Sequence, residues 1–154
     1  MSAVEQFVNC CRDEIEIVDR LVDLLEQEQA LLIQGESQQL ERLADSKSEV
    51  LDLLAAQSSE RGRLMGSQGV QDKDTLYIWL ADKPEACVEW TRLEDAVNRA
   101  QSINQLNAVF VSQRLALVEG SLDVLRSAAA ATLGYGRDGQ TPELVTGRRL
   151  LGSA

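Results

Sequence analysis

The chain has 154 residues, which suits one domain with a modest hydrophobic core. Its 25 Asp and Glu residues against 15 Lys and Arg give a net charge of −10 at pH 7, which disfavours binding to nucleic acid and to anionic membranes. The chain has no histidine, the commonest metal ligand and general base. We therefore expect a protein that is not an enzyme, with no catalytic residues, no metal site and no cofactor.

The composition predicts an all-α fold. Leu, Ala, Glu, Gln and Arg are frequent, whereas the chain has only two Pro, two Trp, two Tyr and two Phe. No apolar run is long enough to span a bilayer, and the N-terminus lacks the pattern of a signal peptide. We expect a cytoplasmic protein in which Cys10, Cys11 and Cys87 are reduced and act as small apolar residues.

The first half of the chain predicts a pair of helices. Apolar residues between positions 2 and 33 recur at alternating steps of three and four, the spacing of a coiled-coil seam. We expect Gly35 to end this helix and Ser37 to cap the next, which spans about residues 38–65. So short a connection predicts an antiparallel helical hairpin.

Two basic residues, Lys47 and Arg61, lie on the apolar seam of the second helix, two heptads apart. Folding the chain about Gly35 brings Lys47 near Glu28 and Arg61 near Glu14. We predict that two charged layers fix the register of the hairpin. The alternative is that both cations extend outward to solvent along their apolar stems.

Residues 66–74 are typical of a loop, and Asp72 or Asp74 is a candidate cap for a short helix after it. We expect the large side chains of this helix to cover one end of the bundle, and a binding surface is the alternative. These residues are Leu76, Tyr77, Trp79 and Leu80. Pro84 suits the first turn of the following helix.

The last predicted helix runs from about Pro84 to Ala131. At 1.5 Å per residue it measures about 70 Å, against about 45 Å for each arm of the hairpin. Together the long helix and the hairpin predict a coiled-coil-like three-helix bundle. Asn104 and Asn107 fall on its seam, where a buried amide sets the register between helices.

If the long helix is straight, its last turns extend beyond the hairpin with apolar residues exposed. These residues form the apolar stripe, and such a patch marks a partner-binding surface. The apolar stripe consists of Val111, Leu115, Val118, Leu122 and Leu125. Alternatives are a break near Gly120 that lets the helix fold back, or cover by a second copy in a homodimer.

A flexible C-terminal tail at residues 134–154 is expected after a helical bundle domain at residues 1–133, since the tail is glycine-rich and poor in apolar residues. Tyr135 begins the exposed stretch Tyr-Gly-Arg-Asp-Gly-Gln-Thr, which makes it a candidate recognition residue. The sequence Gly-x-Gly-x-x-Gly from position 134 follows a helix rather than a strand, so it does not indicate a dinucleotide site.

Helices of this length followed by Tyr-Gly-x-x-Gly-Gln-Thr resemble the FlgN family of bacterial flagellar export chaperones. The Glu-rich first helix, the hairpin lysine Lys47 and the pair Asn104-x-x-Asn107 are also similar to that family. The aromatic segment from Leu76 to Trp79 departs from its pattern.

The resemblance implies a cytoplasmic chaperone of type III flagellar export, without enzymatic activity. Such a chaperone covers the C-terminal amphipathic helix of the hook–filament junction proteins FlgK and FlgL. It delivers them to the export-gate protein FlhA and the export ATPase complex. By analogy, Tyr135 contacts the export gate and the apolar stripe binds the substrate. The alternative is a coiled-coil structural or regulatory adaptor unrelated to flagella.

Overall fold

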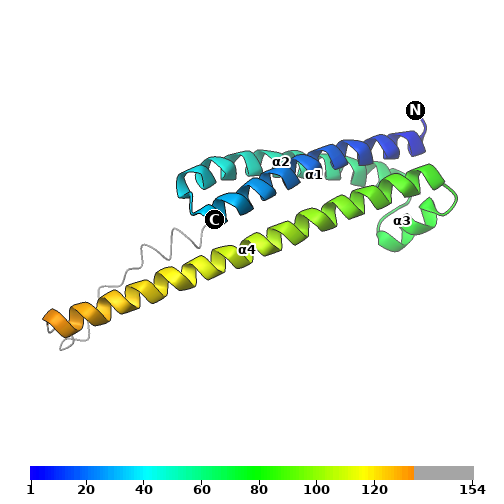
Figure 1. The fold of residues 1–154 in the computed structure, drawn as a ribbon. Coiled ribbons are helices and arrows are strands. Elements are labelled where there is room, and N and C mark those ends of the chain that lie inside the picture. Colours follow the sequence, from blue (N-terminus) through cyan, green and yellow to red (C-terminus); the bar gives the residue numbers. More distant parts are fainter. Residues whose placement is uncertain (134–154) are drawn as a thin grey trace. The chain divides into compact units, whose positions relative to one another are not determined.

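The fold is built from helices, as the composition predicted (Figure 1). The computed structural model describes residues 1–133, without the side chains of residues 129–133. Its helices are α1 (Ala3–Gln34), α2 (Ser37–Ser67), α3 (Lys73–Leu80) and α4 (Pro84–Leu133). The chain divides into two compact units, Met1–Gln113 and Arg114–Ala154, and α4 contributes residues to both. The predicted flexible tail lies outside the described residues.

Both ends of α1 are capped by local hydrogen bonds. Ser2 and Glu5 form a reciprocal capping box at the N-terminus. Gly35 ends the helix, as predicted, in a left-handed conformation with φ 84°, and its N–H donates to the carbonyl of Leu31 at 2.9 Å. Few residues other than glycine adopt this conformation without strain.

The prediction that Ser37 caps α2 is wrong. Ser37 is the first residue of the helix, and Glu36 occupies the cap position without a side-chain hydrogen bond. The turn closes early because the N–H groups of Gly35 and Glu36 both donate to the carbonyl of Leu31, at 2.9 and 3.1 Å. The chain therefore re-enters helical geometry one residue sooner than expected.

Helices α1 and α2 lie side by side in opposite directions, and both predicted charged layers are present (Figure 1). Lys47 Nζ lies 2.8 Å from Glu28 Oε2. Arg61 donates to Glu14, whose side chain is only 2% exposed. Both cations point inward, so the alternative in which they extend to solvent is wrong.

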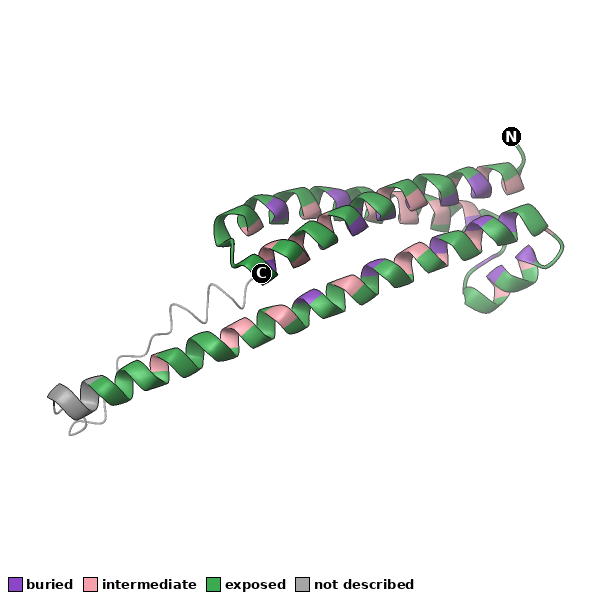
Figure 2. Cartoon of the chain, viewed as in Figure 1, coloured by how far each residue is buried: buried purple, intermediate pink, exposed green. Residues whose placement is uncertain are grey.

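The first part of α4 packs on α1 and runs parallel to it. Arg12 near the start of α1 pairs with Glu89 at 3.3 Å, and Glu26 further along α1 pairs with Arg99 at 2.9 Å. Four buried residues of α4 recur every seven positions, and Figure 2 shows buried residues spaced along this part of the helix. They are Ala86, Leu93, Ala100 and Asn107, and Glu89, which is also buried, lies three positions after Ala86.

Of the two asparagines predicted on the seam of α4, only Asn107 is buried. Its side chain is 2% exposed, and Nδ2 donates to the carbonyl of Leu25 and to Glu28 Oε1, both at 2.9 Å. The prediction for Asn104 is wrong, because its side chain is exposed and the neighbouring Ile103 is half-buried. After Ala100 the next seam residue is Ile103, three positions on, rather than Asn104, four positions on. An apolar side chain therefore packs on the core in place of an amide.

Helix α3 covers one end of the first unit. Asp72 caps it, accepting a hydrogen bond from the N–H of Thr75 at 2.8 Å. Leu76 and Leu80 are buried, and the half-buried Trp79 meets the buried ring of Phe7 edge-on, with 5.2 Å between ring centroids. The prediction that the large side chains of this helix cover one end of the bundle is therefore confirmed for Leu76, Trp79 and Leu80.

Tyr77 differs from its neighbours in α3. Its side chain is 43% exposed and its hydroxyl donates to Glu94 at 2.7 Å, so it does not join the core. An eight-residue helix can turn only part of its surface inward, and Tyr77 lies on the other part. Helix α4 begins at Pro84, as predicted, and its backbone stays helical across Gly120.

Candidate functional site

The four members of the apolar stripe in the second unit share one face of α4, because they are spaced by three, four and three residues. Val111, which belongs to the first unit, is 36% exposed. In the second unit Val118 is 54% exposed and Leu125 is 65% exposed, whereas Leu115 and Leu122 are half-buried. Large apolar side chains exposed at this spacing are typical of a surface that binds another helix.

Sequence reasoning missed further apolar residues on another face of α4. Leu117 is 71% exposed and Val124 is 69% exposed, and their separation of seven positions corresponds to about two helical turns. Their spacing was the signal that could have revealed them. The C-terminal part of α4 thus exposes apolar side chains in two directions.

A groove bordered by α2 and α4 lies within the first unit, and its volume is about 870 Å³. Both helices pack on α1, and Glu14 of α1 lies in the groove together with its partner Arg61. Residues from the loop before α3 and Leu76 also contribute. From α2 the lining residues are Leu54, Ser58, Arg61, Gly62, Met65 and Gly66, and from α4 they are Trp90, Leu93, Glu94, Val97, Asn98 and Gln101. The heptad pattern predicted which helix faces are apolar but not this gap.

Trp90 lines the groove and carries an unpaired hydrogen-bond donor. The Arg61 guanidinium lies over its ring, 5.0 Å from the centroid. Its buried Nε1–H has no hydrogen-bond partner within residues 1–133. Most buried donors are paired, so this one marks a place where an acceptor would be stabilising.

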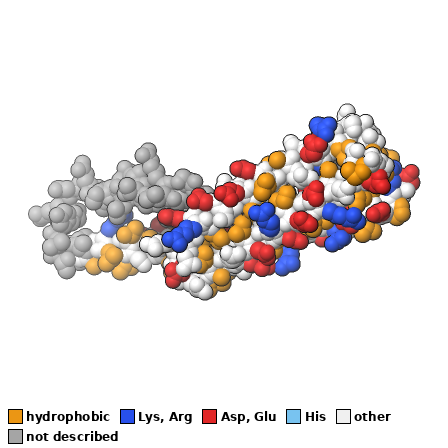
Figure 3. Space-filling view, turned by 90° about the horizontal axis from the view of Figure 1, so that it is seen from above, with side chains coloured by type: hydrophobic (Ala, Val, Ile, Leu, Met, Phe, Trp, Pro, Cys, Tyr) orange, Lys and Arg blue, Asp and Glu red, His pale blue; other side chains and the backbone are white. Residues whose placement is uncertain are grey.

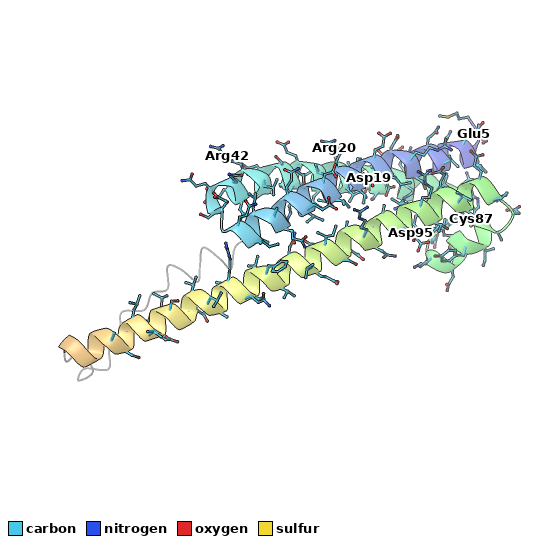
Figure 4. All side chains as sticks on the ribbon, in the orientation of Figure 1. Glu5, Asp19, Arg20, Arg42, Cys87 and Asp95 are labelled. Carbon is cyan, nitrogen blue, oxygen red and sulfur yellow. The ribbon has the colours of Figure 1, made fainter. Side chains whose placement is uncertain are left out.

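The cysteines lie in three different environments. Burial raises the pKa of Cys11 to about 12, which keeps this thiol protonated at neutral pH. The pKa of Cys10 is raised as well, by burial first and then by the nearby charge of Glu14. Cys87 is exposed in the first turns of α4 (Figure 4). None of the three forms a disulfide.

The described residues contain no group of three or more Cys, Asp or Glu side chains placed to hold a metal ion. Acidic and basic side chains are interspersed on the face that Figure 3 shows. Among residues 1–133, no helix is both long and apolar enough to cross a membrane.

Tyr135, the predicted contact to the export gate, falls outside the residues that the structure describes. Within the described residues, the structure pairs Glu14 with Arg61 and Glu28 with Lys47. The residues of the apolar stripe all belong to α4. The structure also reveals the groove, which the sequence alone did not indicate.

The family resemblance of the sequence is confirmed by comparison with known proteins. The model of the FlgN protein family matches residues 1–143, which includes all four helices and the stretch beginning at Tyr135. Searches of the curated proteins and of the solved structures gave no match. Because the family model covers nearly the whole chain, this protein belongs to the FlgN family.

Proposed function

We propose that this protein is a cytoplasmic chaperone of type III flagellar export. It binds the C-terminal amphipathic helix of the hook–filament junction proteins FlgK and FlgL and delivers them to the export gate. The observation that supports this most strongly is membership of the FlgN family over residues 1–143. The same match weighs against a coiled-coil adaptor unrelated to flagella.

The apolar stripe is our candidate for the substrate-binding surface. Val118 and Leu125 are exposed by 54% and 65%, so a partner helix can reach them without unfolding the chaperone. An amphipathic helix that packs against the stripe would remove apolar surface of both molecules from water, which is the main driving force for such association. Binding of this kind involves no covalent chemistry, in keeping with a chaperone that is not an enzyme.

We also propose that Tyr135 contacts FlhA, and that FlhA and the export ATPase complex receive the loaded chaperone. This part of the proposal rests on the resemblance of the stretch Tyr-Gly-x-x-Gly-Gln-Thr to the family, and the stretch lies within the matched residues 1–143. Replacing Tyr135 with Ala should weaken capture of the chaperone by the FlhA cytoplasmic domain while leaving FlgK binding unchanged. Equal capture of both forms would contradict this assignment.

The stripe is tested by charge insertion. Val118→Glu and Leu122→Glu should each weaken binding of a labelled FlgK C-terminal segment, measured by fluorescence anisotropy, because a carboxylate would face an apolar surface. Leu117→Glu is the matched control, since Leu117 is exposed on another face of the same helix. If all three variants stay folded by circular dichroism and bind like the wild type, the stripe is not the substrate surface.

A further inference from the structure

The groove bordered by α2 and α4 presents its lining residues in two matching series. On α2, Leu54, Ser58, Arg61 and Met65 follow one another at steps of four, three and four. On α4, Trp90, Glu94, Val97 and Gln101 follow the same steps. Two helical walls with this spacing provide the holes into which the side chains of one more helix insert.

Two glycines in α2 leave open space on its side of the groove. Gly62 and Gly66 both line the groove, and a Cβ built at either position meets no atom within 4 Å. Glycine weakens a helix interior relative to alanine, and packing inside this chain does not require it at Gly62. A bare backbone at these positions lets another helix approach α2 closely.

The charges of the groove favour a partner helix over a second copy of this chain. Arg61 pairs with the buried Glu14, and Lys73 Nζ lies 3.7 Å from Glu94, which among the described residues leaves Asp72 as the one charged lining residue outside these two pairs. Two copies that each carry a charge of −10 repel one another. The complementary occupant is an amphipathic helix whose polar face is neutral or basic.

We propose that this groove is a second docking site, which receives a further amphipathic helix of the exported C-terminal segment beside α1, α2 and α4. The apolar stripe binds another helix of the same segment, so that one segment occupies both sites. The inference rests on the proposed chaperone function and adds a site to it. The half-buried side chains of Leu54 and Val97 contact the apolar face of the helix. The ring of Trp90, which also lines the groove, packs against the same face.

Filling the groove is the direct test. Gly62→Phe in the full-length chain places a ring beside Gly62, and the fold should tolerate it because a Cβ at this position meets no atom within 4 Å. The probe is a C-terminal segment of FlgK long enough to form both helices, titrated at fixed salt. We expect its Kd to rise at least about tenfold, the loss that one displaced apolar contact commonly produces.

Two matched variants control for the substitution itself. Gly62→Ala adds only a methyl group at the same position and should keep wild-type affinity. Ala56→Phe adds the same aromatic ring to an exposed position of α2 that does not line the groove, and it should also keep wild-type affinity. Circular dichroism melting should show that all three variants remain folded.

The indole resonances of the two tryptophans give an independent readout. Trp90 lines the groove, whereas Trp79 packs on Phe7 and beneath Lys83. In ¹⁵N–¹H spectra, assigned with Trp79→Phe, the Trp90 Nε1–H signal should move during the titration and the Trp79 signal should not. A Trp90 signal that stays in place while the segment binds would overturn the proposal.

The remaining outcomes separate the groove from the chaperone function. If the wild type and Gly62→Phe bind the segment equally, the groove proposal fails and the chaperone function stands. If the wild type binds neither the FlgK segment nor that of FlgL, the chaperone function fails and the groove proposal fails with it. If sedimentation shows a wild-type dimer that Gly62→Phe converts to a monomer, the occupant is a second copy and our assignment of a partner helix is wrong.

Discussion

Arg61 donates two hydrogen bonds to the carboxylate of Glu14, which lies 47 positions earlier in the chain. Ser58 donates a third to the same carboxylate, at 3.1 Å. The Arg61 guanidinium also lies over the ring of Trp90, so one side chain of α2 contacts both α1 and α4. Glu14 is only 2% exposed, so these contacts take the place of water around its carboxylate.

Replacing Arg61 with Met should therefore strongly destabilise the chain. The substitution keeps an apolar stem but leaves Glu14 buried without a cation, which costs about 3–5 kcal/mol of unfolding free energy. The double variant Glu14→Met with Arg61→Met should recover much of this loss. Urea unfolding followed by circular dichroism measures both, and Arg63→Met, which breaks an exposed pair with Glu60, is the control. Equal midpoints for Arg61→Met and Arg63→Met would show that the buried pair is unimportant.

Asn107 and Asn104 form a second matched test, because the two amides differ in burial. Asn107→Leu removes hydrogen bonds to Leu25 and Glu28, and we expect a loss of about 1–3 kcal/mol in unfolding free energy. Asn104→Leu changes an exposed residue and should stay within about 0.5 kcal/mol of the wild type. Thermal or urea unfolding distinguishes them, and a larger effect at position 104 would contradict the register described for α4.

The features of this fold that a few neighbouring residues determine could be predicted from the sequence. The end of α1 at Gly35 and the start of α4 at Pro84 follow from backbone preferences that a few residues express. The pairing of Arg61 with Glu14 was also predictable, because a short turn fixes which positions of two antiparallel helices meet. Asn104 was misplaced because heptad counting permits steps of three or four, and only the packing of Ile103 decides between them.

The candidate sites were predictable to different degrees for the same reason. The apolar stripe is a property of one helix, so its spacing appears in the sequence. The groove depends on the distance between α2 and α4 where both pack on α1, and no single segment of the sequence encodes that distance. Gly62 was the local sign of the groove in the sequence, since a glycine inside a helix needs an explanation.

Phe7 connects the start of α1 to α3. Its side chain is fully buried and its ring contacts Trp79 and Trp90. Phe7→Ala should cost about 3–5 kcal/mol, because it leaves a cavity among these rings. Ile78→Ala in α3 is the control, since Ile78 is 74% exposed. A melting temperature of Phe7→Ala close to that of the control would show that α3 contributes little to the core.

The cysteines should differ in reactivity. Burial raises the pKa of Cys11 to about 12, so at pH 8 almost none of this thiol is the reactive thiolate. Cys87 is exposed and should be alkylated first in the folded protein, whereas Cys11 should react only after denaturation. Mass spectrometry of peptides after a timed iodoacetamide reaction measures this order. Early labelling of Cys11 would mean that α1 opens readily from its neighbours.

The most direct test of the chaperone function is calorimetric titration of the full-length chain with the C-terminal segments of FlgK and FlgL at several temperatures. We expect saturable one-to-one binding with a negative heat-capacity change, because an apolar helix face is removed from water. Absence of binding heat at high micromolar concentration at every temperature, with folded protein and helix-forming segments, would show that the chain is not a chaperone of these two proteins.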